Sequence, residues 1–519
     1  MQEQKKIGYF IKQLRISRNL TQDDFAKLLK TSQSAVARME SGNQNFTTKE
    51  LQKISKILNH KILEISESVD LKIRGGKKLH GSVNTNTSKN GALSLMNLAL
   101  LNNGKTIVRN VPKIEEINRL VEVFKEMGVK VNWINDRDLE IIKSDKIIKT
   151  GLMSESAKSI RSGLMMIGPL AHFMDTFKMP NAGGWKMGVR TISAHQFALE
   201  KLGITIETHE KFYEIKTTEL KEKLESIKND NQKSEKSLKN HAEIIMYEMS
   251  DTATINALLA AALIPAQTDI KFASANYHVQ DVCFSLEKAG VKIEGVGTTN
   301  LKVFGLPEIN QNLELFVSED PTEAMMFISA AIVTNSKLEI KRVPIDFLSL
   351  ELLKLEKMGL KYKKSKVYKS VNEKTDLVDL TLFPSKLKAL PDKIHAQPYP
   401  GINTDNLPFF VPIATGAEGI TLIHDWMWEN RAIYFTELNK LGARVDLADP
   451  HRVFVTGKTD LKAAQIVCPP ALRPATIILV AMLAAKGESI LRNVYSIRRG
   501  YEQIADRLNE LGADIEVIK

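Results

Sequence analysis

The stretch LEKLGITIE, residues 199–207, ends an apolar helix pattern on a glycine and then continues as a strand pattern. Glycine ends a helix readily because it adopts a left-handed backbone conformation at little steric cost. The residues after Gly203 alternate between apolar and polar side chains, which is typical of a half-buried strand. We therefore predict a helix, a tight turn and a strand in this segment.

The same pattern occurs six times in the chain. The other copies are FKEMGVKV at 124–131, LEKAGVKIE at 286–294, LEKMGLKY at 355–362, LNKLGARVD at 438–446 and LNELGADIE at 508–516. The central residues of all six copies are Gly128, Gly203, Gly290, Gly359, Gly442 and Gly512, and consecutive ones are separated by 75, 87, 69, 83 and 70 residues. Such regular recurrence indicates an α/β body built from repeated helix–strand units.

Composition limits the class of protein. The chain has 519 residues, which predicts more than one domain, and 43% hydrophobic residues, which provide for a large core. The two cysteines, Cys283 and Cys468, form no metal-binding or disulfide pattern, so we predict no metal site and a reducing, cytoplasmic location. No signal peptide or apolar run long enough to span a membrane is visible. The net charge of +11 fits nucleic acid, anionic substrates or a lysine-rich solvated surface equally well.

Residues 1–69 differ from the rest and predict five short helices. The first runs over about 4–18, where apolar residues recur at helical spacing. Thr21 and Ser32 are expected to cap the second and third helices, the third ending at Gly42. Thr47 or Thr48 opens a fourth, and residues 62–66 form one more turn. Short helices joined by tight turns are typical of a helix-turn-helix.

The segment that begins LTQDDFAKLLKTSQSAVARMESG at residue 20 resembles the phage-repressor helix-turn-helix family. The resemblance implies DNA binding through Gln33, Ser34 and Arg38 at the recognition helix, and a phosphate contact from Gln22. Glutamine and serine at the start of that helix suit base edges. A module kept only for dimerisation or protein contact is the alternative, since twelve Lys/Arg against eight Asp/Glu over 1–70 give only +4. The family usually binds as a dimer, so a homodimer is also expected.

A charged insertion is predicted at about 210–242. Its core, KEKLESIKNDNQKSEKSLKN, holds few apolar residues. It is interpreted as a mobile surface insertion or an exposed helix, with a role in partner binding as the alternative.

The body carries an ordered series of motifs. They are LHGSVNTNTSKNGALSL from residue 79, IRSGLMMIGPL from 160, NAGGWKMGVRTISAH from 181, VSEDPTEAMMF from 317, GINTDNLPF from 401, WENRA from 428, ALRPA from 471 and RRGYEQIADRLNELGADIE from 498. Together they resemble the UDP-N-acetylglucosamine 1-carboxyvinyltransferases, enolpyruvyl transferases of peptidoglycan synthesis in the cell wall. The resemblance implies six βαβαββ units in two pseudo-symmetric domains, an inside-out barrel. The expected domains are 89–318, and 70–88 combined with 319–519.

The resemblance also implies the site. Asp405 is expected to take the acceptor hydroxyl proton, while Lys89, Arg190 and Arg499 hold the phosphate of phosphoenolpyruvate. The carboxylate is assigned to Arg431 and Arg473, with Arg499. Several fixed cations suit a substrate with about three negative charges. Further substrate-binding residues carried over from the resemblance are Asn90, Arg161, His195, Ser250, Asp320 and Glu323. No metal or organic cofactor is implied.

The sequence departs from the family at four places. Trp185 stands where the family has a loop cysteine or aspartate, and Ala471 replaces an aspartate two places before Arg473. On the nucleotide side, Thr191-Ile192-Ser193 replaces Pro-Val-Asp, and Ser250-Asp251-Thr252 replaces Ser-Val-Gly. These departures concern acid–base catalysis and recognition of the sugar nucleotide.

Three functions remain open from the sequence. The first is an enolpyruvyl transferase that acts on UDP-N-acetylglucosamine and carries its own DNA-binding module. The second is a weakly active or inactive transferase fold that senses a ligand for a transcription regulator. The third is an enolpyruvyl transferase for another hydroxyl, such as a shikimate-type acceptor.

Overall fold

The computed structural model describes residues 4, 7–8, 11–12, 15–16, 20–44, 46–57, 69–144, 147–181, 191–230 and 241–518. The chain divides into two compact units, Met1–Val69 and Asp70–Ile518. No helix within the described ranges is long and apolar enough to cross a membrane.

The N-terminal unit is helical. Its helices are α2 (Gln22–Leu29), α3 (Gln33–Glu40) and α4 (Thr48–Ile57), and the described residues between 4 and 16 are also helical. Thr21 caps α2 in a reciprocal capping box with Asp24, and Ser32 caps α3 through the Ala35 N–H, which confirms both predicted starts. Thr47 makes the equivalent exchange with Glu50. The predicted turn at 62–66 lies outside the described residues.

The core of this unit is small and apolar. Phe25 of α2, Val36 of α3 and Ile54 of α4 are fully or almost fully buried. A buried ion pair joins the first helix to α3, because the Arg15 guanidinium donates to both carboxylate oxygens of Glu40. Its Nη1 also donates to the Leu20 carbonyl, so one arginine ties the turn before α2 to the end of α3.

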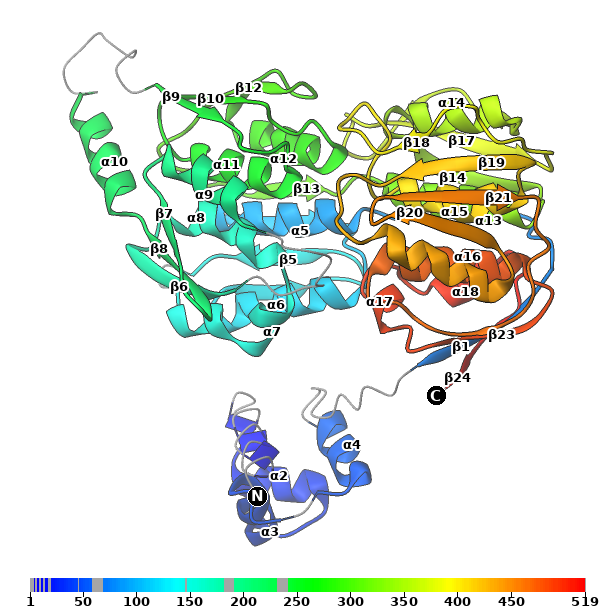
Figure 1. Ribbon diagram of the computed structural model, residues 1–519. Coiled ribbons are helices and arrows are strands. Elements are labelled where there is room, and N and C mark those ends of the chain that lie inside the picture. The colour runs from blue at the N-terminus through cyan, green and yellow to red at the C-terminus, as the bar shows by residue number, and fades with distance from the viewer. Residues whose placement is uncertain are drawn as a thin grey trace. The chain divides into compact units, whose positions relative to one another are not determined.

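The first lobe of the body contains three sheets (Figure 1). In strand order they are β13 (Leu313–Phe316), β3 (Lys105–Arg109), β5 (Leu139–Ile142), β4 (Lys130–Trp133); β11 (Lys292–Glu294), β12 (Asn300–Phe304), β10 (Gln267–Lys271), β9 (Ala242–Ile245); and β6 (Thr176–Pro180), β8 (Phe212–Lys216), β7 (Thr205–Thr208). Its helices are α5 (Lys89–Leu98), α6 (Glu115–Glu126), α7 (Glu155–Ser159), α8 (Ile167–Leu170), α9 (Ser193–Glu200), α10 (Thr218–Asp230), α11 (Asp251–Ala261) and α12 (Tyr277–Lys288), with short 3-10 turns η1 (Ala99–Leu101), η2 (Lys149–Met153) and η3 (Ser162–Met166).

The second lobe contains the other three sheets. In strand order they are β15 (Lys361–Lys364), β17 (Asp376–Phe383), β14 (Leu338–Pro344), β2 (Ser82–Asn84), with β16 (Tyr368–Lys369) also on β17; β18 (Ile394–His395), β19 (Gly419–His424), β21 (Arg452–Gly457), β20 (Arg444–Asp449); and β22 (Gln465–Val467), β23 (Gly487–Arg492), β1 (Asp70–Gly75), β24 (Ile515–Ile518). Its helices are α13 (Pro321–Val333), α14 (Ser349–Met358), α15 (Phe410–Gly416), α16 (Leu472–Ala484), α17 (Tyr495–Arg498) and α18 (Ile504–Glu510), with 3-10 segments η4 (Ile345–Phe347), η5 (Leu407–Phe409) and η6 (Ala432–Leu441).

All six recurring glycines have a positive φ, between 81° and 110°, which confirms the predicted left-handed turns. The strand that follows each of them, β4, β7, β11, β15, β20 or β24, is the edge strand of a different sheet. The mixed α/β fold is therefore as predicted, while the βαβαββ unit and the domain limits, 89–318 and 70–88 with 319–519, stay predictions. The inside-out barrel is not a closed one, because none of the six sheets described closes on itself.

The most apolar helices lie inside the lobes. In α11, every residue from Ala253 to Ala261 is buried, and α13 and α16 are buried over nearly their whole length. Helices that are apolar all round must be covered on every side, and here the sheets and neighbouring helices cover them. The N-terminal ends of α11 and α16 line the cavity described below.

The predicted charged insertion needs a correction at its start. Residues 212–216 form β8, the middle strand of its sheet, and Tyr213 and Ile215 are buried there. A central strand belongs to the fold, so the insertion cannot begin at 210. The charged segment then forms the helix α10 up to Asp230. This helix is exposed on its charged side only, because Leu220 and Ile227 are buried in the core, and residues 231–240 lie outside the described residues.

Candidate active site

A cavity of about 610 Å³ lies in the body and is lined by residues of both lobes. Nine of the predicted site residues line it: Lys89, Asn90, Arg161, His195, Ser250, Asp405, Arg431, Arg473 and Arg499. Four helices, α5, α11, α12 and α16, turn their N-terminal ends towards it. Helix N-termini favour negative charge, so the backbone and the cationic side chains both suit an anionic ligand.

One end of the cavity holds a three-membered charge cluster. Lys89 Nζ donates to Glu116 Oε2 at 3.0 Å, and Arg499 Nη2 lies 3.5 Å from the same oxygen. Burial raises the pKa of the Glu116 carboxyl, but Lys89 and Arg499 outweigh it and hold that pKa below its ordinary value. The cluster joins the lobes, because Lys89 and Glu116 belong to the first and Arg499 to the second.

Sequence reasoning missed Glu116. A signal was present, because Glu116 precedes Leu120 by one helical turn and so falls on the apolar face of α6. A glutamate on a buried face requires a cationic partner.

Asp405 lies between two arginines. Arg473 Nη2 donates to its carboxylate at 3.0 Å, and Arg431 Nη1 lies at 3.8 Å. Burial raises the pKa of Asp405, but Arg473 and Arg431 outweigh it and hold the pKa below its ordinary value. Asp405 is therefore ionised at neutral pH, which is the state that a proton acceptor requires.

The two arginines differ in how much hydrogen-bonding capacity remains. Arg431 is occupied by both carboxylate oxygens of Asp425 and by the Thr404 carbonyl at 2.7 Å. Arg473 donates to the Tyr501 hydroxyl and to Asp405, but its buried Nε has no partner. Arg473 thus has one donor that the protein leaves unsatisfied, whereas Asp425 and Thr404 occupy the guanidinium of Arg431.

The part of the cavity wall that belongs to the first lobe carries a neutral histidine. His195 is buried, and burial together with Arg161 lowers its pKa to about 3. Its Nδ1 lies 3.1 Å from the side-chain nitrogen of Asn256, which can only donate, so Nδ1 accepts and the proton is on Nε2, facing Thr252 at 3.3 Å. Ser250 caps α11 beside this histidine.

Two of the predicted site residues that the structure describes, Asp320 and Glu323, do not join the cavity lining. Asp320 caps α13 by accepting from the Thr322 N–H at 2.8 Å, and Glu323 accepts from the Asn86 N–H and from Arg507. Their predicted role in substrate binding stays a prediction. Arg190 lies outside the described residues, as does the departure at Trp185.

Ala471 lies in the cavity wall directly before α16 and leaves that helix without a side-chain cap. Cys468 is buried nearby, and burial raises the pKa of its thiol to about 12. A thiol that stays protonated is a poor nucleophile, so Cys468 offers no substitute for the acid–base group missing at Ala471.

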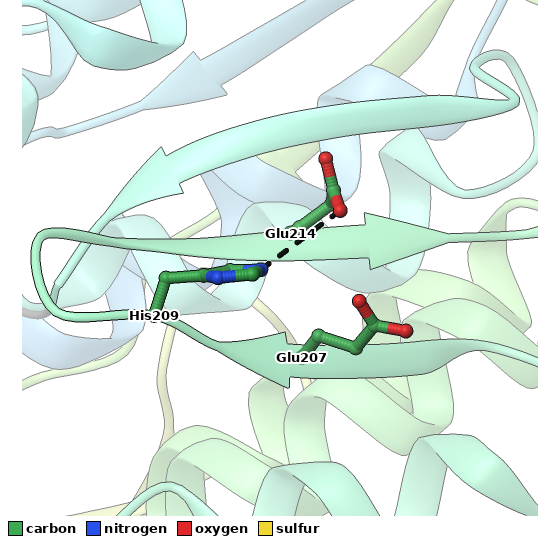
Figure 2. Close-up of side chains that lie close together, drawn as sticks. All are labelled: Glu207, His209 and Glu214. Atoms are coloured by element: carbon green, nitrogen blue, oxygen red, sulfur yellow. Dashed lines mark ion pairs between the residues drawn. The ribbon is translucent and has the colours of Figure 1, made fainter.

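A second group of titratable side chains lies on the β7–β8 hairpin. Glu207, His209 and Glu214 offer ligand atoms within 4.8 Å of one another (Figure 2). Both carboxylates are already ion-paired, Glu207 with Lys216 at 2.5 Å and Glu214 with Lys178 at 3.6 Å. These lysines neutralise the cluster, so it does not indicate a cation site.

The N-terminal unit presents the predicted recognition helix to solvent. Gln33, Ser34 and Arg38 on α3 are all exposed. Gln22 is half-buried, accepts from Gln33 Nε2 at 2.6 Å and donates to Glu40 at 2.8 Å. Gln33 is thus held at the start of α3 with its remaining hydrogen-bonding groups outward, the place from which a base edge is read.

Comparison with known proteins agrees with this geometry. The family described as EPSP synthase (3-phosphoshikimate 1-carboxyvinyltransferase) matches residues 73–508, and a helix-turn-helix family matches residues 11–65. The chain therefore belongs to the EPSP synthase family of enolpyruvyl transferases and carries an N-terminal helix-turn-helix domain.

Its relatives include two UDP-N-acetylglucosamine 1-carboxyvinyltransferases. The one from Treponema denticola is 31% identical over 446 residues, and the one from Borreliella burgdorferi is 30% identical over 447. Each alignment covers 86% of this chain and 98% of the relative. Among solved structures, the enolpyruvyl transferase NikO from Streptomyces tendae matches with a TM-score of 0.70 at 21% identity, over 87% of this chain and all of that one. EPSP synthase from Acinetobacter baumannii matches at 0.66 and 16%, with the same coverage.

Proposed function

We propose that the body transfers the enolpyruvyl group of phosphoenolpyruvate to the 3-hydroxyl of UDP-N-acetylglucosamine. The observation that carries the proposal is an ionised Asp405 held between Arg431 and Arg473, in one cavity with Lys89 and Arg499. This set combines a proton acceptor with cations for a phosphate and a carboxylate. The names of the relatives support the choice of acceptor.

The chemistry follows from these positions. Lys89 and Arg499 bind the phosphate, with Arg190 as a further proposed cation, and Arg473 binds the carboxylate. Asp405 accepts the hydroxyl proton as the acceptor oxygen bonds to C2, and C3 gains a proton. Loss of a proton from the C3 methyl group and cleavage of the bond between C2 and the phosphate oxygen then release phosphate and restore the double bond. The cations stabilise the charge of the tetrahedral intermediate.

Binding of phosphate must compete with Glu116. This carboxylate neutralises Lys89 and Arg499, and a phosphate that replaces it as their partner leaves Glu116 to be protonated or reoriented. Phosphate binding at this end therefore takes up a proton or moves the α6 side chain. Calorimetric titration with phosphoenolpyruvate in buffers of different ionisation heat measures that uptake directly.

The test of the proposal is phosphate release from phosphoenolpyruvate with and without UDP-N-acetylglucosamine. Arg499→Ala is compared with Arg498→Ala, a matched control because Arg498 is adjacent, exposed and absent from the cavity lining. Sugar-dependent release that persists in the control and disappears in Arg499→Ala supports the transferase. Release that is independent of the sugar, or equal in both variants, contradicts it.

A second candidate function rests on Ala471. This wall position has no acid–base group, so the cavity can bind its ligands while turnover is slow or absent. The body then acts as a ligand sensor for the helix-turn-helix unit. Ligand binding without phosphate release, together with a change of DNA affinity on adding ligand, favours this function.

We also propose that the N-terminal unit binds DNA, as a homodimer, through α3. The exposed Gln33 and Arg38 support this, with Gln33 fixed by Gln22. Selection from random duplexes gives the preferred site. Gln33→Ala should then reduce the discrimination between bases at one position of that site by about 1–3 kcal/mol of binding free energy. Arg38→Ala should weaken binding to all DNA sequences and reduce the salt dependence of binding. Light scattering of the full chain with and without that duplex tests the dimer.

A further inference from the structure

Asp251, in the cavity wall, binds three side chains through its carboxylate. It is the first residue of α11, and its carboxylate accepts from Ser274 Oγ, from Asn276 Nδ2 at 3.0 Å and from His278 Nε2 at 3.2 Å. Burial raises the pKa of Asp251, but His278 and the neighbouring donors outweigh it and hold the pKa below its ordinary value. The carboxylate is therefore ionised and fixed in direction by three partners.

From Asp251 a line of hydrogen bonds crosses to the second lobe. Asn276 Oδ1, which caps α12, also accepts from Asn403 Nδ2 at 3.4 Å. Asn403 Oδ1 in turn accepts from the backbone N–H of Asp405 at 2.8 Å, closing a short turn. The line therefore runs Asp251–Asn276–Asn403–Asp405, and its Asn276–Asn403 step crosses from one lobe to the other.

The geometry points to Asp251 as a positioning residue for Asp405. Asp251 orients the Asn276 amide, Asn276 holds the Asn403 side chain, and Asn403 sets the turn from which Asp405 reaches Arg473. Because the Asn276–Asn403 step spans the lobes, the direction of Asp405 depends in part on a restraint from the first lobe. The catalytic meaning of this inference rests on the proposed transferase function, whereas the structural line itself does not.

Two features distinguish positioning from simple packing. Glu351 already holds the same loop from within the second lobe, through the Asn403 N–H at 3.1 Å and the Asn406 side chain at 2.8 Å. The contribution of Asp251 is thus a second, inter-lobe restraint on a loop that is otherwise anchored. We therefore expect its loss to change the direction and mobility of Asp405 rather than unfold the loop.

The test uses two substitutions, one in each lobe, on either side of the Asn276–Asn403 step. Asp251→Asn keeps the size of the side chain and removes its charge. Asn403→Ser keeps an oxygen able to accept from the Asp405 N–H but is too short to reach Asn276. Asn310→Ser, at an exposed position in the loop before β13, is the matched control. The four proteins, with the double variant as a fifth, are compared in full-length form.

The first readout is steady-state phosphate release. Each single variant should lower kcat about tenfold with the KM for phosphoenolpyruvate within about twofold, because misplacement of a reacting group affects the transition state more than binding. The double variant should lose no more than either single one, since both cut the same line. Multiplicative losses, or a rise in KM with kcat unchanged, would overturn the positioning role.

The second readout does not need turnover. Amide hydrogen exchange of a peptide covering 401–409 should be severalfold faster in Asp251→Asn than in the wild type, although the substitution lies in the other lobe, and unchanged in Asn310→Ser. Unchanged exchange in Asp251→Asn refutes the line whether or not the wild type is active. A wild type without sugar-dependent phosphate release contradicts only the proposed function, and faster exchange then still supports the line.

Discussion

Replacing Glu351 with glutamine should change how the stability of the body depends on pH. Glu351 is in the first turn of α14 with 1% of its surface exposed, and its Oε1 accepts from the Asn403 N–H and the Asn406 side chain. Burial raises its pKa from 4.5 to about 7. Glutamine keeps the accepting oxygen but cannot ionise, so the variant isolates the effect of the charge.

The sign follows from proton binding. Between pH 4.5 and about 7 the folded chain keeps a proton on Glu351 that the unfolded chain has released, so stability falls as the pH rises. The contribution of this proton is fully present below about pH 4.5 and is lost as the pH rises through about 7. A difference of 2.5 in pKa corresponds to about 3 kcal/mol, of which about 2.5 kcal/mol falls between pH 5 and pH 8.

The assay is denaturant unfolding at pH 5 and pH 8, followed by tryptophan fluorescence. All four tryptophans lie beyond residue 69, so the signal reports the body alone. The difference in unfolding free energy, wild type minus Glu351→Gln, should fall by about 2.5 kcal/mol from pH 5 to pH 8. Glu225→Gln, on the exposed side of α10, should show no such change. An equal difference at both pH values would refute the argument that this carboxyl is held protonated.

Three further predictions concern other parts of the chain. Asp405→Asn should lower kcat for phosphate release by about 10²–10⁴, the usual contribution of a positioned proton acceptor, and near-normal turnover would remove Asp405 from that role. Glu40→Ala leaves the Arg15 guanidinium buried without its partner and should cost the N-terminal unit about 3–5 kcal/mol, seen as faster amide exchange over 20–44 in the full chain; unchanged exchange would contradict this. Cys468, whose thiol pKa is raised to about 12, should resist iodoacetamide at pH 8 in the native protein, and rapid labelling found by peptide mass would show that the thiol is accessible.

Local signals in the sequence predicted local structure well. The six glycines needed no partner to be recognised as left-handed turns, and Thr21 and Ser32 needed only their own helices to act as caps. The cationic residues of the cavity were predicted from the order of the motifs along the chain, because that order indicates the family and therefore its fold. The segment Asp320-Pro-Thr-Glu323 also has the local pattern of a helix start, and capping is the use that the structure shows for Asp320.

Pairings between distant residues could not be read in this way. Glu116 belongs to the charge cluster because Arg499, of the other lobe, lies against it. Asn276 likewise contacts Asn403, which is 127 positions away in the sequence. The start of the charged insertion was placed wrongly because β8 alternates charged and apolar residues, so its charges masked a central strand. Each of these depends on what lies opposite a side chain, and composition does not contain that information.

The sheet that holds β1 has a consequence for synthesis of the chain. β1 opens the body, yet it pairs with β23 and β24 at the far end of the sequence, and Arg74 meets Asp514 across 440 positions (Figure 1). On the ribosome, β1 therefore stays without its neighbours until nearly the whole body has been translated. The described helices of the preceding unit share a core formed within residues 11–54, so that core can form much earlier. A nascent chain stalled before β23 would thus carry a folded helix-turn-helix together with an unpaired β1, and an unpaired strand is a template for aggregation until β23 and β24 are synthesised and pair with it.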